Sequence, residues 1–238
     1  MPSAQQEQIE KPLQVRADNQ PADLHALLHT IHASKTSNLN LLHSRGSVLF
    51  SEGEPARGVY ILRSGRATVT ISSSEGQFVM LRLAQVGDVL GLNSVLRGGS
   101  YDTTVKTFES CRTDFIARAD LIDVMQRSQV GAQAIIEMLS RELAELTDRA
   151  KLLLLPRTVP GRLARLLLEW SKQNCAGRSS SAPLDRIFTH EEIAQMICSS
   201  RETVTRQLAS LSKRQIIRVT SDSILIRDHV ALEKLAFS

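Results

Sequence analysis

The chain has 238 residues, of which 42% are hydrophobic and 23% charged, a composition typical of a globular protein with one large or two smaller domains. It contains no apolar run of membrane-spanning length, and its first 20 residues lack the apolar core of a signal peptide, so we expect a cytoplasmic protein with no membrane partner. The three cysteines, Cys111, Cys175 and Cys198, lie far apart, which argues against a disulfide framework or a zinc ribbon.

The beginning of the chain carries few structural signals. Residues 1–21 are polar and show no periodic pattern, so we expect a flexible tail. A short helical segment follows, in which His25, His29 and His32 stand at i, i+4 and i+7 and therefore on one helical face. Histidines four residues apart can share a metal ion, whereas most such residues are partly exposed helix positions. Both interpretations stay open, and we expect no other metal site.

Residues 45–118 are typical of a small all-β domain. Runs rich in β-branched residues recur about every ten positions and end at glycine turns, which predicts a sandwich or barrel. Such a fold can be a ligand pocket, a scaffold or a metal-dependent enzyme, and the enzyme needs inward-facing histidines to hold its metal. No histidine occurs between Gly46 and Thr189, so we do not expect an enzyme.

A long amphipathic helix is predicted over about residues 130–155. Its apolar residues recur at alternating steps of three and four over nearly three heptads, as in a coiled coil. The helix either lies on the core of its own chain or pairs with a second copy. Pro156 and Pro160-Gly161 then end it and predict a hinge. The residues predicted to form the homodimer interface are Ile136, Leu139, Leu143, Leu146, Ala150 and Leu153.

Residues 189–213 have the pattern of a helix-turn-helix motif. Thr189 with Glu192 three residues later has the spacing of a capping box, and Ser199 or Ser200 can cap a second helix. The second helix would point Val204, Leu208 and Leu211 inward, at i, i+4 and i+7. Two β-rich runs at 216–220 and 224–226 surround a polar turn and predict a hairpin. The whole unit is therefore predicted to be a winged helix-turn-helix.

The outer face of that second helix carries Arg201, Glu202 and Arg206. Arginine can donate two hydrogen bonds to guanine, and a carboxylate can accept one from the N4 amino group of cytosine. Mixed charge can also serve solubility alone. Charge favours DNA binding, because residues 157–238 hold 13 Lys and Arg against 8 Asp and Glu, a net +5, whereas the rest of the chain carries −1. The residues predicted to contact double-stranded DNA are Arg201, Glu202, Arg206, Ser200, Thr205, Thr189 and Lys213.

This order of parts resembles the CRP/FNR family of bacterial transcription factors, named after the cyclic-AMP receptor protein and the fumarate–nitrate regulator. The resemblance covers about residues 24–232. Its most specific element is the string from Ser200 to Arg206, Ser-Arg-Glu-Thr-Val-x-Arg. The β-roll glycines and the hinge string Gly-Arg-Leu-Ala at 161–164 add to it. The glycines are Gly53, Gly65, Gly87 (followed by Asp88) and Gly91.

The resemblance implies an α+β protein and a homodimeric regulator. Its parts would be a tail (1–21), a β-roll (jelly-roll) effector domain like those that bind cyclic nucleotides (22–128), a dimerisation helix (129–156) and a winged helix-turn-helix (157–238). It also implies a near-palindromic operator with a TGTGA-like half-site, contacted by Arg201, Glu202 and Arg206. Thr205 occupies the position where the fumarate–nitrate branch has a serine, which would relax the half-site. The serine-rich segment 174–186 falls where relatives of this family contact RNA polymerase, but its composition is only that of a mobile connector.

The expected effector pocket departs from the family pattern. Gly91 is kept, but Leu92 replaces the glutamate that binds the ribose, and Tyr101-Asp102-Thr103 replaces the segment whose arginine pairs with the cyclic phosphate. Thr147 matches the adenine-contacting threonine of the family. A phosphate without a cationic partner is disfavoured, so we do not expect cyclic AMP to bind in the family's manner unless Arg82, Arg97 or Lys106 substitutes.

The cofactor and the effector therefore stay unassigned. No cysteine precedes Cys111, so we expect no iron–sulfur cluster. Three functional alternatives follow from the sequence: a regulator with an unidentified effector at the β-roll, a ligand-independent repressor, and a cyclic-nucleotide-responsive activator with an atypical pocket.

Overall fold

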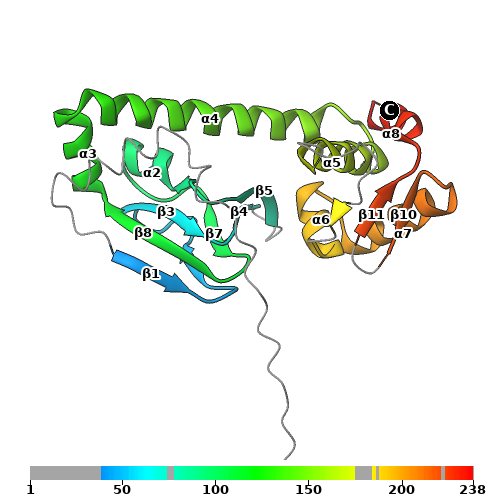
Figure 1. Cartoon of the computed structure of the whole chain (residues 1–238), viewed down its shortest axis with the longest axis horizontal. Coiled ribbons are helices and arrows are strands. Elements are labelled where there is room, and N and C mark those ends of the chain that lie inside the picture. The colour runs from blue at the N-terminus through cyan, green and yellow to red at the C-terminus, as the bar shows by residue number, and fades with distance from the viewer. Residues whose placement is uncertain (1–38, 74–77, 175–183, 186–187, 221–222, 238) are drawn as a thin grey trace, which may run out of the picture.

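The computed structural model describes residues 39–73, 78–174, 184–185, 188–220 and 223–237. The predicted tail, the His25, His29 and His32 face, and most of the serine-rich segment lie outside these residues. Within them, no helix is long and apolar enough to cross a membrane. Two domains are joined by one long helix (Figure 1).

The N-terminal domain consists of two four-stranded antiparallel sheets, with strand orders β1-β8-β3-β6 and β2-β7-β4-β5. This arrangement confirms the predicted all-β domain. β5 has only β4 as a neighbour and so forms one edge of its sheet. The strands are β1 (Leu39–His43), β2 (Val48–Phe50), β3 (Gly58–Ser64), β4 (Ala67–Ser72), β5 (Phe78–Ala84), β6 (Val89–Leu90), β7 (Thr104–Thr107) and β8 (Cys111–Ala117).

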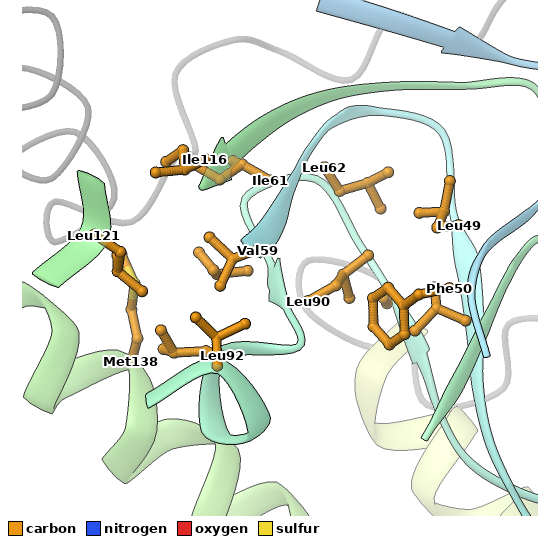
Figure 2. Close-up of a cluster of buried hydrophobic side chains, with 14 of the residues drawn as sticks. Leu49, Phe50, Val59, Ile61, Leu62, Leu90, Leu92, Ile116, Leu121 and Met138 are labelled. Atoms are coloured by element: carbon orange, nitrogen blue, oxygen red, sulfur yellow. The ribbon is translucent and has the colours of Figure 1, made fainter. Parts of the chain in front are cut away.

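The core of this domain lies between the two sheets and under three helices. Ile61, Leu62 and Ile116 are fully buried, and burying each such side chain stabilises the fold by about 1.5–3 kcal/mol. Figure 2 shows them in one cluster that extends to Leu121 and Met138. The helices are α2 (Leu92–Arg97), α3 (Arg118–Arg127) and α4 (Gln129–Leu154). The sequence analysis did not predict α2, which lies inside the segment 45–118 expected to be all-β, or α3, which begins at the end of that segment.

Helix α4 connects the two domains. Its 26 residues span about 39 Å at 1.5 Å per residue, and the Ser128 hydroxyl caps it by accepting the amide of Gly131 over 3.0 Å. Ala134, Ile135 and Met138 bury one side of its first half on the β domain. Leu152 near the other end is buried in the core of the C-terminal domain.

The C-terminal domain is a winged helix-turn-helix, as predicted. Helix α5 packs against α8, and the strands form a three-stranded sheet in the order β10-β11-β9. The two-residue strand β9 was not predicted, since its length gives no periodic signal. The elements are α5 (Val159–Asn174), β9 (Leu184–Asp185), α6 (His190–Met196), α7 (Arg201–Lys213), β10 (Ile217–Val219), β11 (Ser223–Ile226) and α8 (His229–Ala236).

The two domains also touch directly, where α6 packs against strand β5 (Figure 1). Met80 of β5 is 1% exposed and belongs to the hydrophobic core of the C-terminal domain. The Phe108 ring, between β7 and β8, lies 5.6 Å from the Phe188 ring, which stacks on Trp170 at 5.1 Å. The α6 end of the C-terminal domain is thus held against the β domain.

Candidate nucleic-acid interface

Helix α6 begins at a complete capping box. The Thr189 amide donates to the Glu192 carboxylate over 2.6 Å, and the Glu192 amide donates to the Thr189 hydroxyl over 3.2 Å. Two amides that a helix start leaves without partners are thereby satisfied. This confirms the helix start predicted from the spacing of the two residues, and it gives Thr189 a structural function.

The turn between α6 and α7 is tight, and a side chain of helix α5 stabilises it through hydrogen bonds. Cys198 adopts a left-handed conformation with φ of 49°, and the Ser199 amide bonds back to the Ala194 oxygen over 3.0 Å. Arg162 of α5 donates from Nε to the Ile197 oxygen over 2.7 Å, and its Nη2 lies 3.4 Å from the Cys198 oxygen. Arg162 was part of the family string but was not predicted to hold the turn. Sequence alone does not show which carbonyls a long side chain will reach.

Helix α7 is fixed by its start and its buried face. The Ser200 hydroxyl accepts the Thr203 amide over 3.2 Å, which settles the choice between Ser199 and Ser200 as the cap. Val204, Leu208 and Leu211 are all buried, as predicted, in the core of the C-terminal domain. Because these three side chains anchor one side of α7, its other side faces solvent. Replacing Leu208 by alanine would remove part of that anchor at a cost of about 2–5 kcal/mol.

The solvent-facing side of α7 carries the predicted base-contacting set. Arg201, Glu202, Thr205, Arg206 and Lys213 are all exposed. Hydrogen bonds from its own backbone amide and from Ser200 hold the pKa of Glu202 below its ordinary value. Glu202 is therefore a carboxylate at neutral pH and can only accept hydrogen bonds, which is what contact with a cytosine amino group requires.

A histidine that the sequence analysis did not single out belongs to the same surface. His190, the first residue of α6, places Nδ1 2.8 Å from the Thr205 hydroxyl on α7. The Thr205 hydroxyl also lies 2.9 Å from the main-chain oxygen of Arg201. The contact ties the start of α6 to the exposed face of α7. A residue 15 positions away in sequence gives no local signal for such a pair.

The six predicted interface residues of α4 fall into two groups. Ile136 is 60% exposed, Leu143 66% and Leu146 41%, and Ala150 is exposed as well. Leu139 and Leu153 are half-buried, the first against the β-domain core and the second against the C-terminal core. Along its length α4 therefore covers its own domains with one side and leaves an apolar stripe open on another.

The predicted effector residues do not gather around one open pocket. Gly91 has φ of 81°, and a Cβ there would come within 2.7 Å of the Tyr101 ring. Tyr101 is itself buried, stacked on Phe50 at 3.8 Å between ring centroids, and its hydroxyl donates to the Gly58 oxygen. Thr147 lies elsewhere, exposed on α4, where its hydroxyl donates to the Leu143 oxygen over 2.8 Å.

Asp102 is bound by side chains of the neighbouring helix α2. It forms an ion pair with Arg97, and the Ser94 hydroxyl lies 3.1 Å from its carboxylate. Arg97 is thereby bound by a carboxylate instead of standing open for a phosphate. Thr103, the next predicted residue, is half-buried. Lys106, a further predicted substitute cation, is exposed on β7.

The space between the β6 end of the β domain and α4 is small and charged. It has a volume of about 30 Å³, whereas pockets for drug-sized ligands have about 300–1,000 Å³. Leu92 and Met138 contribute to its lining, together with Arg82. Arg82 forms ion pairs with Asp88 and, over 3.5 Å, with Glu145 of α4. The arginine that the sequence offered as a phosphate partner is therefore paired with carboxylates of the protein.

These carboxylates are affected by burial. Desolvation raises the pKa of Glu142 and of Glu145 above the ordinary value, and the positive charge of Arg82 opposes that rise in both. Asp88 adds to the rise because like charges disfavour ionisation. The described residues contain no cluster of three or more His, Cys, Asp or Glu side chains suited to a metal ion.

The fold and this surface define a class of protein: a β-roll sensor-type domain joined by a long helix to a winged helix-turn-helix. Two family models match the chain, the cyclic nucleotide-binding domain over residues 42–128 and the Crp-like helix-turn-helix domain over residues 161–235. Both matches fall on the domains just described.

Whole-chain relatives agree with the two domains. A "CRP-like cAMP-activated global transcriptional regulator" from Mycobacterium tuberculosis is 29% identical, over 81% of this chain and 85% of the relative. The "Cyclic AMP receptor protein" of Thermus thermophilus is 27% identical, over 82% and 87%. Among solved structures, a transcriptional regulator of the CRP/FNR family from Thermus thermophilus has a TM-score of 0.64 at 25% identity, covering 84% of this chain and 99% of that one.

A second solved structure supports the fold alone. FixK2 from Bradyrhizobium japonicum superposes with a TM-score of 0.68 at 22% identity, covering 85% of this chain and 98% of that chain. The chain belongs to the CRP/FNR family of transcription regulators, with a cyclic nucleotide-binding domain and a Crp-like helix-turn-helix. It is a DNA-binding regulator and not an enzyme, as the sequence predicted.

Proposed function

We propose that this regulator acts as a cytoplasmic homodimer on a near-palindromic operator with a TGTGA-like half-site. The observation that carries the proposal is the exposed set Arg201, Glu202 and Arg206 on a helix anchored by three buried residues. Two arginines and a carboxylate at these spacings match adjacent guanine and cytosine edges in the major groove. Lys213 at the other end of α7 would contribute a phosphate contact.

The open stripe on α4 supports the dimer. Ile136 and Leu143, seven residues apart, are each at least 60% exposed on the helix that joins the two domains. Exposed apolar side chains at heptad spacing are stabilised by packing against a second helix of the same kind. A two-fold axis along α4 would present two copies of α7, and two recognition helices about one helical turn apart require an operator with matching symmetry.

The effector is the least determined part of the proposal. Relatives named for activation by cyclic AMP suggest a nucleotide, but here the cation beside α4 is paired with Asp88 and Glu145. The cavity of about 30 Å³ at this place favours a second candidate, a regulator that binds DNA without a ligand. A cyclic-nucleotide-responsive activator would have to open this ion-paired junction first. Gly91, Leu92, Tyr101, Asp102, Thr103 and Thr147 remain the residues to test for effector contact.

The deciding experiment is selection of bound DNA from a random duplex pool by the full-length protein, with its mass measured in solution. We expect an enriched inverted repeat and a dimer. A monomer, or equal affinity for the enriched site and for scrambled duplex, would refute the proposal. Titrating the selected site with and without cyclic AMP or other nucleotides separates the effector alternatives, because a ligand-independent binder keeps the same Kd throughout.

A further inference from the structure

The hydroxyl of Thr205 has two short contacts and only one proton. Its oxygen lies 2.9 Å from the Arg201 main-chain oxygen and 2.8 Å from Nδ1 of His190. A carbonyl oxygen can only accept, so the contact to Arg201 is a hydrogen bond only if the hydroxyl donates its proton there. The contact to His190 is then a hydrogen bond only if Nδ1 carries a proton and donates it to Thr205. This assignment satisfies both contacts, and it follows from the hydrogen-bond network.

This assignment determines whether the exposed Thr205 hydroxyl on the recognition helix donates or accepts a hydrogen bond. A threonine hydroxyl with a free proton can rotate to donate or to accept, and so can contact any base. In Thr205 the proton is directed at the main chain of α7, and one lone pair is filled by His190. Toward solvent, the Thr205 oxygen can therefore only accept a hydrogen bond. The neighbouring Glu202 is also an acceptor, whereas Arg201 and Arg206 can only donate.

We propose that His190 is a positioning residue that makes Thr205 an acceptor-only base contact, so that the protein prefers an amino-bearing base, adenine or cytosine, on the edge that Thr205 faces. Adenine N6 and cytosine N4 donate in the major groove, whereas guanine and thymine present acceptors there. The inference rests on the proposed function, because it assumes that α7 enters a major groove. It adds a base-specificity determinant contributed by α6.

A competing basis for preference at the same base is the methyl group of threonine, which can pack against the methyl group of thymine. That contact would favour thymine and would not involve His190. Thr205→Val separates the two, since valine keeps the branched shape and removes the oxygen. His190 offers a matched pair: asparagine can place an amide N–H near the position of Nδ1, whereas glutamine places its amide near that of Nε2.

The experiment is selection from a random duplex pool, followed by Kd measurements on sites that carry each of the four bases at the position that depends on Thr205. We expect the natural protein and His190→Asn to prefer adenine or cytosine by about 3- to 10-fold, the value of one net hydrogen bond. Thr205→Val and His190→Gln should lose this preference and keep those at the positions contacted by Arg201 and Arg206. Circular dichroism of each variant verifies that the domain remains folded.

A modified base provides a second, more specific test of the inference. Replacing the preferred base by an analogue without its exocyclic amino group should lower the DNA affinity of the natural protein by the same factor as the substitution Thr205→Val does. The same analogue should not lower the DNA affinity of the Thr205→Val variant any further. The inference would be overturned if Thr205→Val kept the preference for adenine or cytosine. It would also be overturned if Thr205→Val lost that preference but His190→Gln kept it. Either result would leave the proposed function intact. Absence of any selected motif would instead refute the proposed function.

Discussion

Arg149 of α4 donates a hydrogen bond over 2.6 Å to the main-chain oxygen of Met80 in β5. The same terminal nitrogen also donates to the Met196 oxygen at the end of α6. One side chain thus joins the β-domain edge, the connecting helix and the helix-turn-helix. Burial lowers the pKa of Arg149, and its Nε is buried with no hydrogen-bond partner in the described part of the chain. The interaction therefore carries a desolvation cost that the two carbonyl contacts must offset.

Replacing this arginine should loosen the contact between the domains. In Arg149→Ala the Met80 and Met196 carbonyls lose their donor, and we expect a stability loss of about 1–3 kcal/mol, the cost of leaving a buried polar group without its hydrogen-bond partner. Thermal unfolding followed by circular dichroism measures it. Lys151→Ala is the control, because Lys151 is exposed and pairs only with Asp148 among the ion pairs of the described residues, a surface interaction worth about 0–1 kcal/mol. Equal losses in both variants would contradict the bridging function of Arg149.

The aromatic contact between the domains can be followed through the single tryptophan of the chain. Trp170 stacks on Phe188, which in turn contacts Phe108 of the β domain. Phe108→Ala should admit water to this stack, shift Trp170 emission to longer wavelength and cost roughly 1–3 kcal/mol, less than the roughly 3–5 kcal/mol of a fully buried ring. Phe78→Ala, at a ring that is 54% exposed, should leave the emission unchanged. An unchanged spectrum in Phe108→Ala would show that the domains do not rest on this contact in solution.

These interdomain contacts mark the limit of the sequence analysis. The recognition helix was predictable because its cap and its buried residues Val204, Leu208 and Leu211 are local signals. The β strands and α4 were predictable for the same reason. Met80 falls in the segment 45–118 that was predicted to be all-β, but its burial in the core of the other domain depends on how the two domains pack in space. Arg149 stands on the polar side of α4, and the heptad pattern shows which side of a helix is apolar but not which groups its polar side will contact.

Glu142 should make stability depend on pH in a defined direction. Burial raises its pKa in the folded protein, so the folded state holds this proton more tightly than the unfolded state. The stabilising effect is complete below the unfolded pKa and is lost as pH rises through the folded pKa. Glu142→Gln should therefore be more stable than the natural protein at neutral and alkaline pH, and the difference should shrink in acid. Urea unfolding across that pH range tests it.

The matched control for this prediction is Glu137→Gln, at an exposed position on the same helix. A loss of stability in Glu142→Gln at neutral pH that disappears in acid would mean that Glu142 stabilises the fold as a carboxylate near Arg82, and the argument from burial would be wrong.

The exposed stripe of α4 predicts the effect of a charge at its centre. Leu143→Glu should yield a folded monomer, since Leu143 is 66% exposed and contributes little to its own core, whereas two glutamates facing each other at a dimer seam repel. The monomer should bind the selected inverted repeat far more weakly than the natural protein. Leu42→Glu, at a leucine 75% exposed in β1, should stay dimeric. Sedimentation velocity distinguishes the two, and a dimeric Leu143→Glu would remove α4 as the interface.

The two ends of α7 should respond differently to truncation. Arg201 lies in the first turn, where its guanidinium can donate two hydrogen bonds to one guanine, so Arg201→Ala should cost about 1–3 kcal/mol on the selected site and relax preference at one base. Lys213 lies 12 residues further on, in the last turn, and contributes charge toward phosphates. Lys213→Ala should weaken specific and random duplex alike and lower the salt dependence by about one counterion. Both are measured by Kd at several salt concentrations. If Arg201→Ala weakened random duplex as much as the selected site, its contact would be to the DNA backbone, and the half-site would have to be attributed to Glu202 and Arg206.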